Sequence, residues 1–503
     1  MLSVPIDISS ELSQSTEDLK VLRRMAWACV VLQLSACGCY IFCNQLYPYS
    51  HTLSVSCGYL AICISIFPVF YLIYRKRFPL VFSCISIYNL APIWFLYLET
   101  VIPGYDANEY SSPSLVMESL IWVAVFQISV NLLYVWMGNR LSLFGKHTLS
   151  FLDHTRLSTN FYITLSAFSF FLPLIAFYYY YDSADILWKA LTAGRSGGGS
   201  AGSLLIQDAA GGSSSLMLPL TYIWQLTPLF AAIALAQSRR ITLPSFFVLL
   251  LGGLVIFSFF LGGSRGNMMF VVAPVVFYLI YYNWDKGLKF WIPLGLLLVL
   301  SIGIMELQER YRGNLLDVLA NPSKAAKEND YTSATTFNIA ASHRDNNMYL
   351  LCLIVNGYPK KYSFEGFNDV YAIIVNPIPR AFWSGKPVRK EAQELASPYG
   401  FISDGPVLIT TTSLSYSVVG EAYKAAGLIG IVAYSMIYVL FLAFFDGVLF
   451  YVRKSHALSV GVLGMALFLA FWGFRSLYAL ITFSYPLLLF LIMIRLLQRR
   501  RGQ

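Results

Sequence analysis

The sequence predicts an all-α polytopic membrane protein, with about 12 transmembrane helices and one large loop outside the membrane. Of the 503 residues, 57% are hydrophobic and only 12% are charged, and the mean hydropathy is +0.61. Soluble domains are about one quarter charged, so a soluble fold is not expected. Apolar runs of about 20 residues, enough to cross a bilayer as a helix, recur along the chain. A single long polar stretch, residues 307–426, interrupts them late in the sequence.

Nine apolar runs precede the polar stretch, and short basic or glycine-rich connections separate many of them. Arg75-Lys76-Arg77 ends the second run, Arg239-Arg240 ends the sixth, and Gly262-Gly263 turns the chain after the seventh. The nine spans are expected at residues 25–43, 52–74, 78–98, 114–137, 159–180, 216–237, 241–261, 267–284 and 288–306. Three more are expected after the polar stretch, at residues 427–451, 457–474 and 477–494.

The chain is therefore expected to have three parts. Residues 1–306 contain nine spans with short loops, residues 307–426 form the large loop that carries the site, and residues 427–503 contain three spans and a basic tail. Lysine and arginine gather in every second connection, including both terminal segments. The positive-inside rule places both termini in the cytoplasm and the loop outside.

Several function classes are excluded or disfavoured by what the sequence lacks. The net charge of +9 comes from basic residues dispersed at helix ends, so no nucleic-acid partner is expected. Gly197 to Gly202 matches G-x-G-x-x-G but follows no strand, and is interpreted as a flexible loop. The chain contains no G-x-x-x-x-G-K-[ST], no Asp-x-Asp motif and no paired C-x-x-C spacing. Neither a cofactor nor a metal is therefore predicted.

Arginines at the outer ends of spans and in the large loop are the candidate pyrophosphate-binding residues. The planar guanidinium makes paired hydrogen bonds to phosphate that a lysine ammonium does not make. Snorkelling to lipid headgroups, or simple solvation in a loop, is the alternative interpretation for each of them. The candidate residues are Arg265, Arg310, Arg312, Arg344, Arg380 and Arg475.

Two residues are candidate catalytic bases. His343 is the single histidine of the large loop, and imidazole can accept a proton from a sugar hydroxyl near neutral pH. A structural role for this histidine stays open. Glu421 competes with it, although this carboxylate could equally stabilise the start of the tenth helix through the helix dipole.

A proline-rich segment of the large loop supplies the candidate substrate-binding residues. Pro377 and Pro379 fix their own φ angles and disfavour helix in the residues before them. The stiff backbone would present Arg380, Trp383 and Lys386 with little conformational entropy left to lose. A rigid structural turn is the alternative interpretation.

At these residues the chain resembles the bacterial oligosaccharide repeat-unit polymerases, the Wzy-type O-antigen polymerase family. The many-span layout with a large outer loop late in the chain agrees over most of the length. The segment from Ser342 to Asn346 also resembles the His-Asn segment of the related O-antigen ligases. The resemblance is carried by Pro379-Arg380-Ala381-Phe382-Trp383-Ser384-Gly385-Lys386-Pro387, Gly420-Glu421-Ala422-Tyr423 with Gly427 and Gly430, and Ser264-Arg265-Gly266.

The resemblance implies a fold in the broad membrane glycosyltransferase-C class, in the bacterial inner membrane with a periplasmic loop. It implies polymerisation of undecaprenyl-pyrophosphate-linked oligosaccharides into O-antigen-type or related surface polysaccharide. Further partners it implies are membrane lipids, a chain-length regulator and a flippase. We hypothesise an inverting, metal-independent transfer, in which the arginines stabilise the departing pyrophosphate and His343 or Glu421 deprotonates the acceptor.

Three alternatives stay open at this point. An O-antigen ligase shares the chemistry but uses lipid A core as its acceptor. A flippase or exporter of lipid-linked glycans would need the same anion-binding arginines without a base. A glycosyltransferase dependent on lipid-phosphate sugars is expected to carry acidic residues in its first outer loop, and residues 44–52 contain none.

Overall fold

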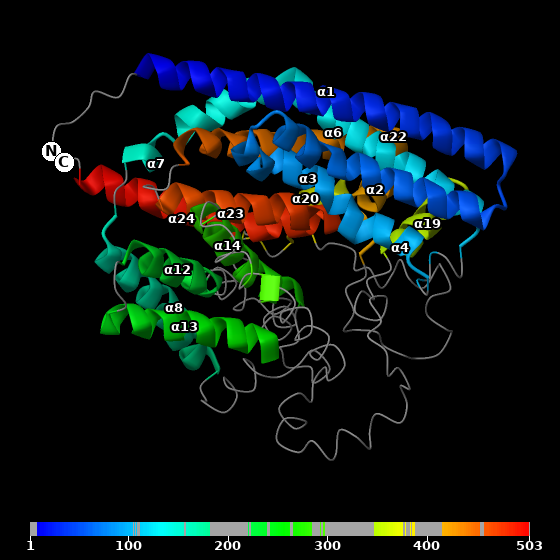
Figure 1. Ribbon diagram of the computed structural model, residues 1–503. Coiled ribbons are helices and arrows are strands. Elements are labelled where there is room, and N and C mark those ends of the chain that lie inside the picture. The colour runs from blue at the N-terminus through cyan, green and yellow to red at the C-terminus, as the bar shows by residue number, and fades with distance from the viewer. Residues whose placement is uncertain are drawn as a thin grey trace.

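The computed structural model contains helices as its regular elements in every part of the chain that it describes (Figure 1). It describes residues 8–103, 105, 107, 111–154, 157–181, 220, 223–238, 242–261, 265–283, 292, 295–296, 347–375, 378, 383, 385–387, 415–452 and 457–501. The α-helices are α1 (Ile8–Leu46), α2 (His51–Tyr74), α3 (Cys84–Pro92), α4 (Leu98–Val101), α6 (Pro113–Thr148), α7 (Phe151–His154), α8 (Thr159–Tyr181), α12 (Thr227–Gln237), α13 (Leu243–Leu261), α14 (Arg265–Asn283), α19 (Asn347–Gly357), α20 (Asn368–Val375), α22 (Ser417–Asp446), α23 (Ala457–Trp472) and α24 (Leu477–Arg501).

Shorter helical turns connect some of these helices. A π-helical turn at Ile93–Tyr97 joins α3 to α4, and a 3₁₀ turn at Gly473–Arg475 joins α23 to α24. Two further 3₁₀ turns, Phe78–Phe82 and Gly447–Tyr451, precede α3 and follow α22. Residues 84–101 therefore run as one continuous helical segment of the bundle.

Nine helices of the described part are long and apolar enough to cross a membrane, which confirms the all-α membrane class. They coincide with nine of the expected spans and lie at Glu17–Leu46, His51–Tyr74, Cys84–Val101, Pro113–Thr148, Thr159–Tyr179, Leu243–Phe260, Ser417–Tyr451, Leu458–Arg475 and Leu477–Leu496. Shorter apolar helices, Ile223–Gln237 and Met268–Tyr281, stand where the sixth and eighth spans are expected. The total of twelve spans and the large loop stay predictions.

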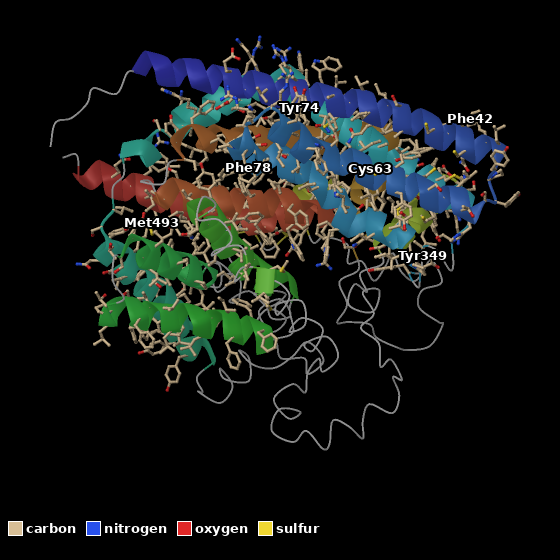
Figure 2. The ribbon with its side chains drawn as sticks, in the orientation of Figure 1. Phe42, Cys63, Tyr74, Phe78, Tyr349 and Met493 are labelled. Atoms are coloured by element: carbon tan, nitrogen blue, oxygen red, sulfur yellow. The ribbon has the colours of Figure 1, made fainter. Side chains whose placement is uncertain are left out.

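The two terminal helices define the two ends of the bundle. The start of α1 and the end of α24 lie at the same end of the bundle in Figure 1. Tyr349 of α19 and Met493 of α24 lie toward opposite ends, and large apolar side chains such as Phe42 cover the outside (Figure 2). The end opposite the termini is called the distal end below. That it faces the periplasm stays a prediction from the charge pattern.

Helix α6 lies at the centre of the main group of helices and packs along both α1 and α22. Near the terminal end, α6 and α22 approach so closely that a Cβ atom built on Gly145 would lie 2.1 Å from the carbonyl oxygen of Phe444. Asp446 joins three helices near this end. Its carboxylate accepts hydrogen bonds from the Cys84 amide, at 2.5 Å, and from the Tyr134 hydroxyl, at 2.7 Å. The Asp446 carboxylate thus ties α22 to both α3 and α6.

Helix α22 begins at Ser417, earlier than the expected start at Gly427, and it contains a kink. Ala426 (φ −162°, ψ 31°) and Gly427 (φ 56°, ψ −130°) have non-helical backbone angles. The expected start therefore coincides with the kink, and a distal arm, residues 417–425, precedes it. Glu421 and Lys424 interrupt the apolar run before Gly427, so hydropathy alone predicts a span only from Gly427 onward.

Helix α19 lies within the stretch that the sequence analysis assigns to the large loop. Met348, Leu351 and Cys352 are fully buried, and the helix packs against α6 and α22. Its 11 residues span only about 16 Å at 1.5 Å per residue. Because this length is too short for a membrane span, a search for runs of about 20 residues does not detect it.

Candidate functional site

The structure describes four of the predicted site residues in full: Glu421, Arg475, Trp383 and Lys386. Arg265 is the first residue of α14, and its side chain is outside the described part. The predictions for His343, Arg310, Arg312, Arg344 and Arg380 also fall outside the described residues. The candidate site is therefore built from the distal arm of α22 and the elements that contact it.

Glu421 and Arg475 come together at the distal end, although 53 residues separate them in the sequence. The Glu421 Oε2 atom accepts a hydrogen bond of 2.7 Å from the backbone amide of Leu477, the first residue of α24. Beside it, the Ser415 hydroxyl donates to the carbonyl oxygen of Arg475 at 2.5 Å. The distal arm of α22 is thus fastened to the turn between α23 and α24.

The contact of Glu421 with α24 has a clear physical basis. The first amides of a helix have no intrahelical acceptor, and the positive end of the helix dipole attracts a carboxylate. The sequence analysis left open that Glu421 stabilises the start of its own helix. The structure places it instead at the start of α24, where it is 6% exposed. A catalytic role for Glu421 stays a prediction.

Arg475 presents its guanidinium next to an aromatic ring. The guanidinium carbon lies 5.6 Å from the centroid of the Trp472 ring, within the range of a cation–π contact. Trp472 is in turn packed edge-on against Phe95 of the turn before α4, at 5.5 Å between ring centroids. The cation is therefore held against a rigid aromatic support at the end of α23.

Lys424, on the same distal arm, is the centre of a buried ion cluster. Its ammonium lies 2.9 Å from Glu365 Oε2 and 3.4 Å from Asp369 Oδ2. The Tyr358 hydroxyl donates to the other oxygen of Glu365 at 2.6 Å, and the Tyr416 ring centroid lies 5.4 Å from the ammonium. This cluster ties the segment that leads from α19 to α20 onto the distal arm.

The same segment satisfies carbonyl groups that the kink releases. The helix cannot supply amides in register across Ala426 and Gly427, so carbonyls of the distal arm need other donors. The amide of Glu365 donates to the Lys424 carbonyl at 3.2 Å, and the amide of Gly366 donates to the Ala425 carbonyl at 2.9 Å. The backbone of residues 365–366 therefore stabilises the kinked form of α22.

Trp383 and Lys386 lie next to each other and next to α20. The Lys386 amide donates to the Trp383 carbonyl at 3.2 Å, and the Lys386 ammonium donates to the Ile378 carbonyl at 3.0 Å. The Trp383 ring meets the Tyr371 ring edge-on, with 6.3 Å between centroids. The predicted substrate-binding pair is thus a local unit built on α20.

Helix α20, on which this pair is built, contacts both helices that meet at the junction, α22 and α24. Asp369, in its first turn, contacts Lys424 of the distal arm. Four residues later, the Ile373 carbonyl accepts a hydrogen bond of 3.1 Å from the Tyr485 hydroxyl of α24. Helix α20 is therefore held by both the distal arm of α22 and α24, and residues of these three helices make up the candidate site.

Sequence reasoning missed two charged groups that organise this end of the molecule. One is Lys424, to which the sequence analysis gave no role, together with its partners Glu365 and Asp369. The other is Glu99, fully buried, whose two oxygens accept from the amides of Asn347, at 3.0 Å, and Met348, at 2.6 Å. A charge beside an apolar run was the available signal, since a charge that becomes buried requires a partner.

The geometry and composition define the class of the protein as a helical membrane protein with charged groups clustered at one end of its bundle. No protein-family model, no curated protein and no solved structure matches the chain. The assignment to the repeat-unit polymerases therefore depends on the sequence motifs described above. It is carried forward as a proposal.

Proposed function

We propose that the protein polymerises lipid-linked oligosaccharide repeat units at the distal end of its bundle, as a membrane glycosyltransferase of the inner membrane. The observation that supports this most directly is the junction of Glu421 and Arg475. One of the motifs that resemble the polymerase family, Gly420 to Tyr423, meets the turn that carries the candidate residue Arg475 there, through the 2.7 Å bond from the Leu477 amide to Glu421. A carboxylate and a guanidinium carried by these neighbouring elements would suit transfer from a pyrophosphate carrier.

The proposed reaction is one displacement at the anomeric carbon of the donor glycan. The acceptor sugar hydroxyl forms the new carbon–oxygen bond while the bond to the pyrophosphate oxygen breaks with inversion. Undecaprenyl pyrophosphate leaves with the electron pair, and His343 or Glu421 takes the proton of the hydroxyl. Arg475 and the other candidate arginines would stabilise the negative charge that develops on the leaving group.

The deciding experiment uses purified full-length protein in detergent with undecaprenyl-pyrophosphate-linked repeat units. We expect a ladder of longer lipid-linked products, separated by gel electrophoresis. Transfer to added lipid A core without chain growth would instead identify a ligase. Movement of the substrate across the bilayer of proteoliposomes without any new glycosidic bond would identify a flippase or exporter.

The guanidinium of Arg475 provides a prediction within this proposal. The Arg475→Lys variant keeps the charge but loses the planar pair of donors, so we expect about a tenfold lower rate of ladder formation. Arg75→Lys is the matched control, because Arg75 also lies over an aromatic ring, at 5.5 Å from the Tyr71 centroid, but near the terminal end of α2. Equal rates for the two variants would remove Arg475 from the proposed site.

A further inference from the structure

Seven of the eight cysteines lie between residues 29 and 84, and two of them meet where α1 packs against α2. Cys43 is three residues from the end of α1, and Cys57 is six residues after the start of α2. A short turn joins the two helices into an antiparallel hairpin, which brings these two positions close together (Figure 1). The side chains of Cys43 and Cys57 are in hydrogen-bonding contact, and both are thiols in the structure.

The two thiols differ in their access to solvent. Cys57 is 4% exposed and belongs to the hydrophobic core, whereas Cys43 is half-buried at the edge of that core. A buried cysteine on its own commonly acts as a small apolar side chain. Disulfide formation requires two sulfurs that can approach each other and a thiol that an oxidant can reach. This pair meets both conditions, with an outer thiol at Cys43 and an inner thiol at Cys57.

The pair lies near the distal boundary of the membrane-spanning region. Phe42, which precedes Cys43 in the chain, lies at the distal end of the bundle in Figure 2. Tyr47 and Tyr49, in the turn between the two helices, are exposed, and aromatic residues are enriched at membrane–water interfaces. At 1.5 Å per residue, Cys43 is only about 5 Å from the end of α1. A water-soluble oxidant can therefore approach its sulfur.

We propose that Cys43 and Cys57 form a disulfide that joins α1 to α2 once the distal end faces the oxidising compartment outside the membrane. Thiols held in contact in such a compartment are readily oxidised, whereas the cytoplasm keeps them reduced. The charge pattern of the chain predicts this orientation. The disulfide goes beyond the proposed function and does not depend on it, because it fastens the first helical hairpin whatever reaction the distal end performs.

The oxidant is a disulfide-bonded thiol oxidase, and the exchange takes two displacements. The Cys43 thiolate attacks one sulfur of the oxidase disulfide, which releases the other as a thiolate and leaves a mixed disulfide. The Cys57 thiolate then attacks the Cys43 sulfur, and the second oxidase sulfur leaves with the electron pair. Two electrons and two protons thus pass from the cysteine pair to the oxidase, whose disulfide becomes two thiols. In this order the buried sulfur reacts only with its neighbour.

Differential labelling of the full-length protein tests the disulfide in cells. Free thiols are blocked with N-ethylmaleimide, first in intact cells and again on denaturation, and the protein is then reduced and labelled with an isotopically heavy maleimide. We expect the heavy label at Cys43 and Cys57, and a peptide pair that joins them in an unreduced digest. Cys63, an exposed cysteine of α2, is the control and should carry the first label. First label on both Cys43 and Cys57, or a link from either of them to another cysteine such as Cys39, would overturn the proposal.

Oxidation of the purified protein separates the contact from the compartment. Reduced full-length protein in detergent should regain the link between Cys43 and Cys57 when it is incubated with oxidised glutathione. The Cys43→Ser variant should lose this link completely, whereas Cys63→Ser should form it to the same extent as the wild type. Wild-type protein that gains no link would overturn the proposal, because the two sulfurs could not then reach disulfide geometry. A link in the purified protein but not in cells would also overturn it, and would count against the outward orientation of the distal end.

Discussion

Replacing Lys424 with methionine is expected to lower the free energy of unfolding by about 3 kcal/mol, because it leaves two carboxylates without their cation. The lysine side chain is 3% exposed, and those of Glu365 and Asp369 are 20% exposed. Removing one partner of a buried ion pair costs about 3–5 kcal/mol, and the residual exposure places this cluster at the lower end. Thermal unfolding of the purified protein in detergent measures the change.

The matched control for this prediction is an exposed ion pair. Lys20 lies 2.8 Å from Glu17, but these side chains are 57% and 50% exposed, so Lys20→Met should cost less than about 1 kcal/mol. Adding Glu365→Gln and Asp369→Asn to Lys424→Met should restore part of the loss, because no buried charge is then left alone. If Lys424→Met were no more destabilising than Lys20→Met, the cluster would not hold the distal arm.

Hydropathy was sufficient to predict the class and most of the spans. Runs of about 20 apolar residues are a strong signal because each must satisfy its own backbone groups in lipid. The same signal fails for α19, which is buried by other helices rather than by lipid, and whose short length carries no such constraint. It also fails at the start of α22, where Glu421 and Lys424 find polar partners inside the protein.

The candidate site was predictable only in part. Glu421 and Arg475 were selected as single residues from motif and position, and their junction depends on how α22 meets α24 in three dimensions. The partners of Lys424 could not be predicted, because Glu365 and Asp369 lie more than 50 residues away in a segment without a motif. Long-range pairing of this kind requires the tertiary fold.

In the sequence, Gly427 and Gly430 were noted only as part of a motif. In the structure, they explain why the distal arm can bend. Gly427 has φ 56° and ψ −130°, a conformation that only glycine adopts without strain. A Cβ atom on Gly430 would lie 1.9 Å from the carbonyl oxygen of Ala422. The bend therefore needs one glycine for its backbone angles and another for the close approach of the two arms.

Gly430→Ala is accordingly expected to displace the distal arm, with a loss of about 2–3 kcal/mol in unfolding free energy from overpacking against backbone. Since the arm carries Glu421 to the Leu477 amide, we expect ladder formation by the folded fraction to fall about a hundredfold, as small misplacements of reacting groups can do. Gly253→Ala is the control, because nothing lies within 4 Å of its added Cβ. Full activity in a folded Gly430→Ala protein would show that the arm position does not govern the reaction, and the junction of Glu421 and Arg475 would then have to be assigned to stability alone.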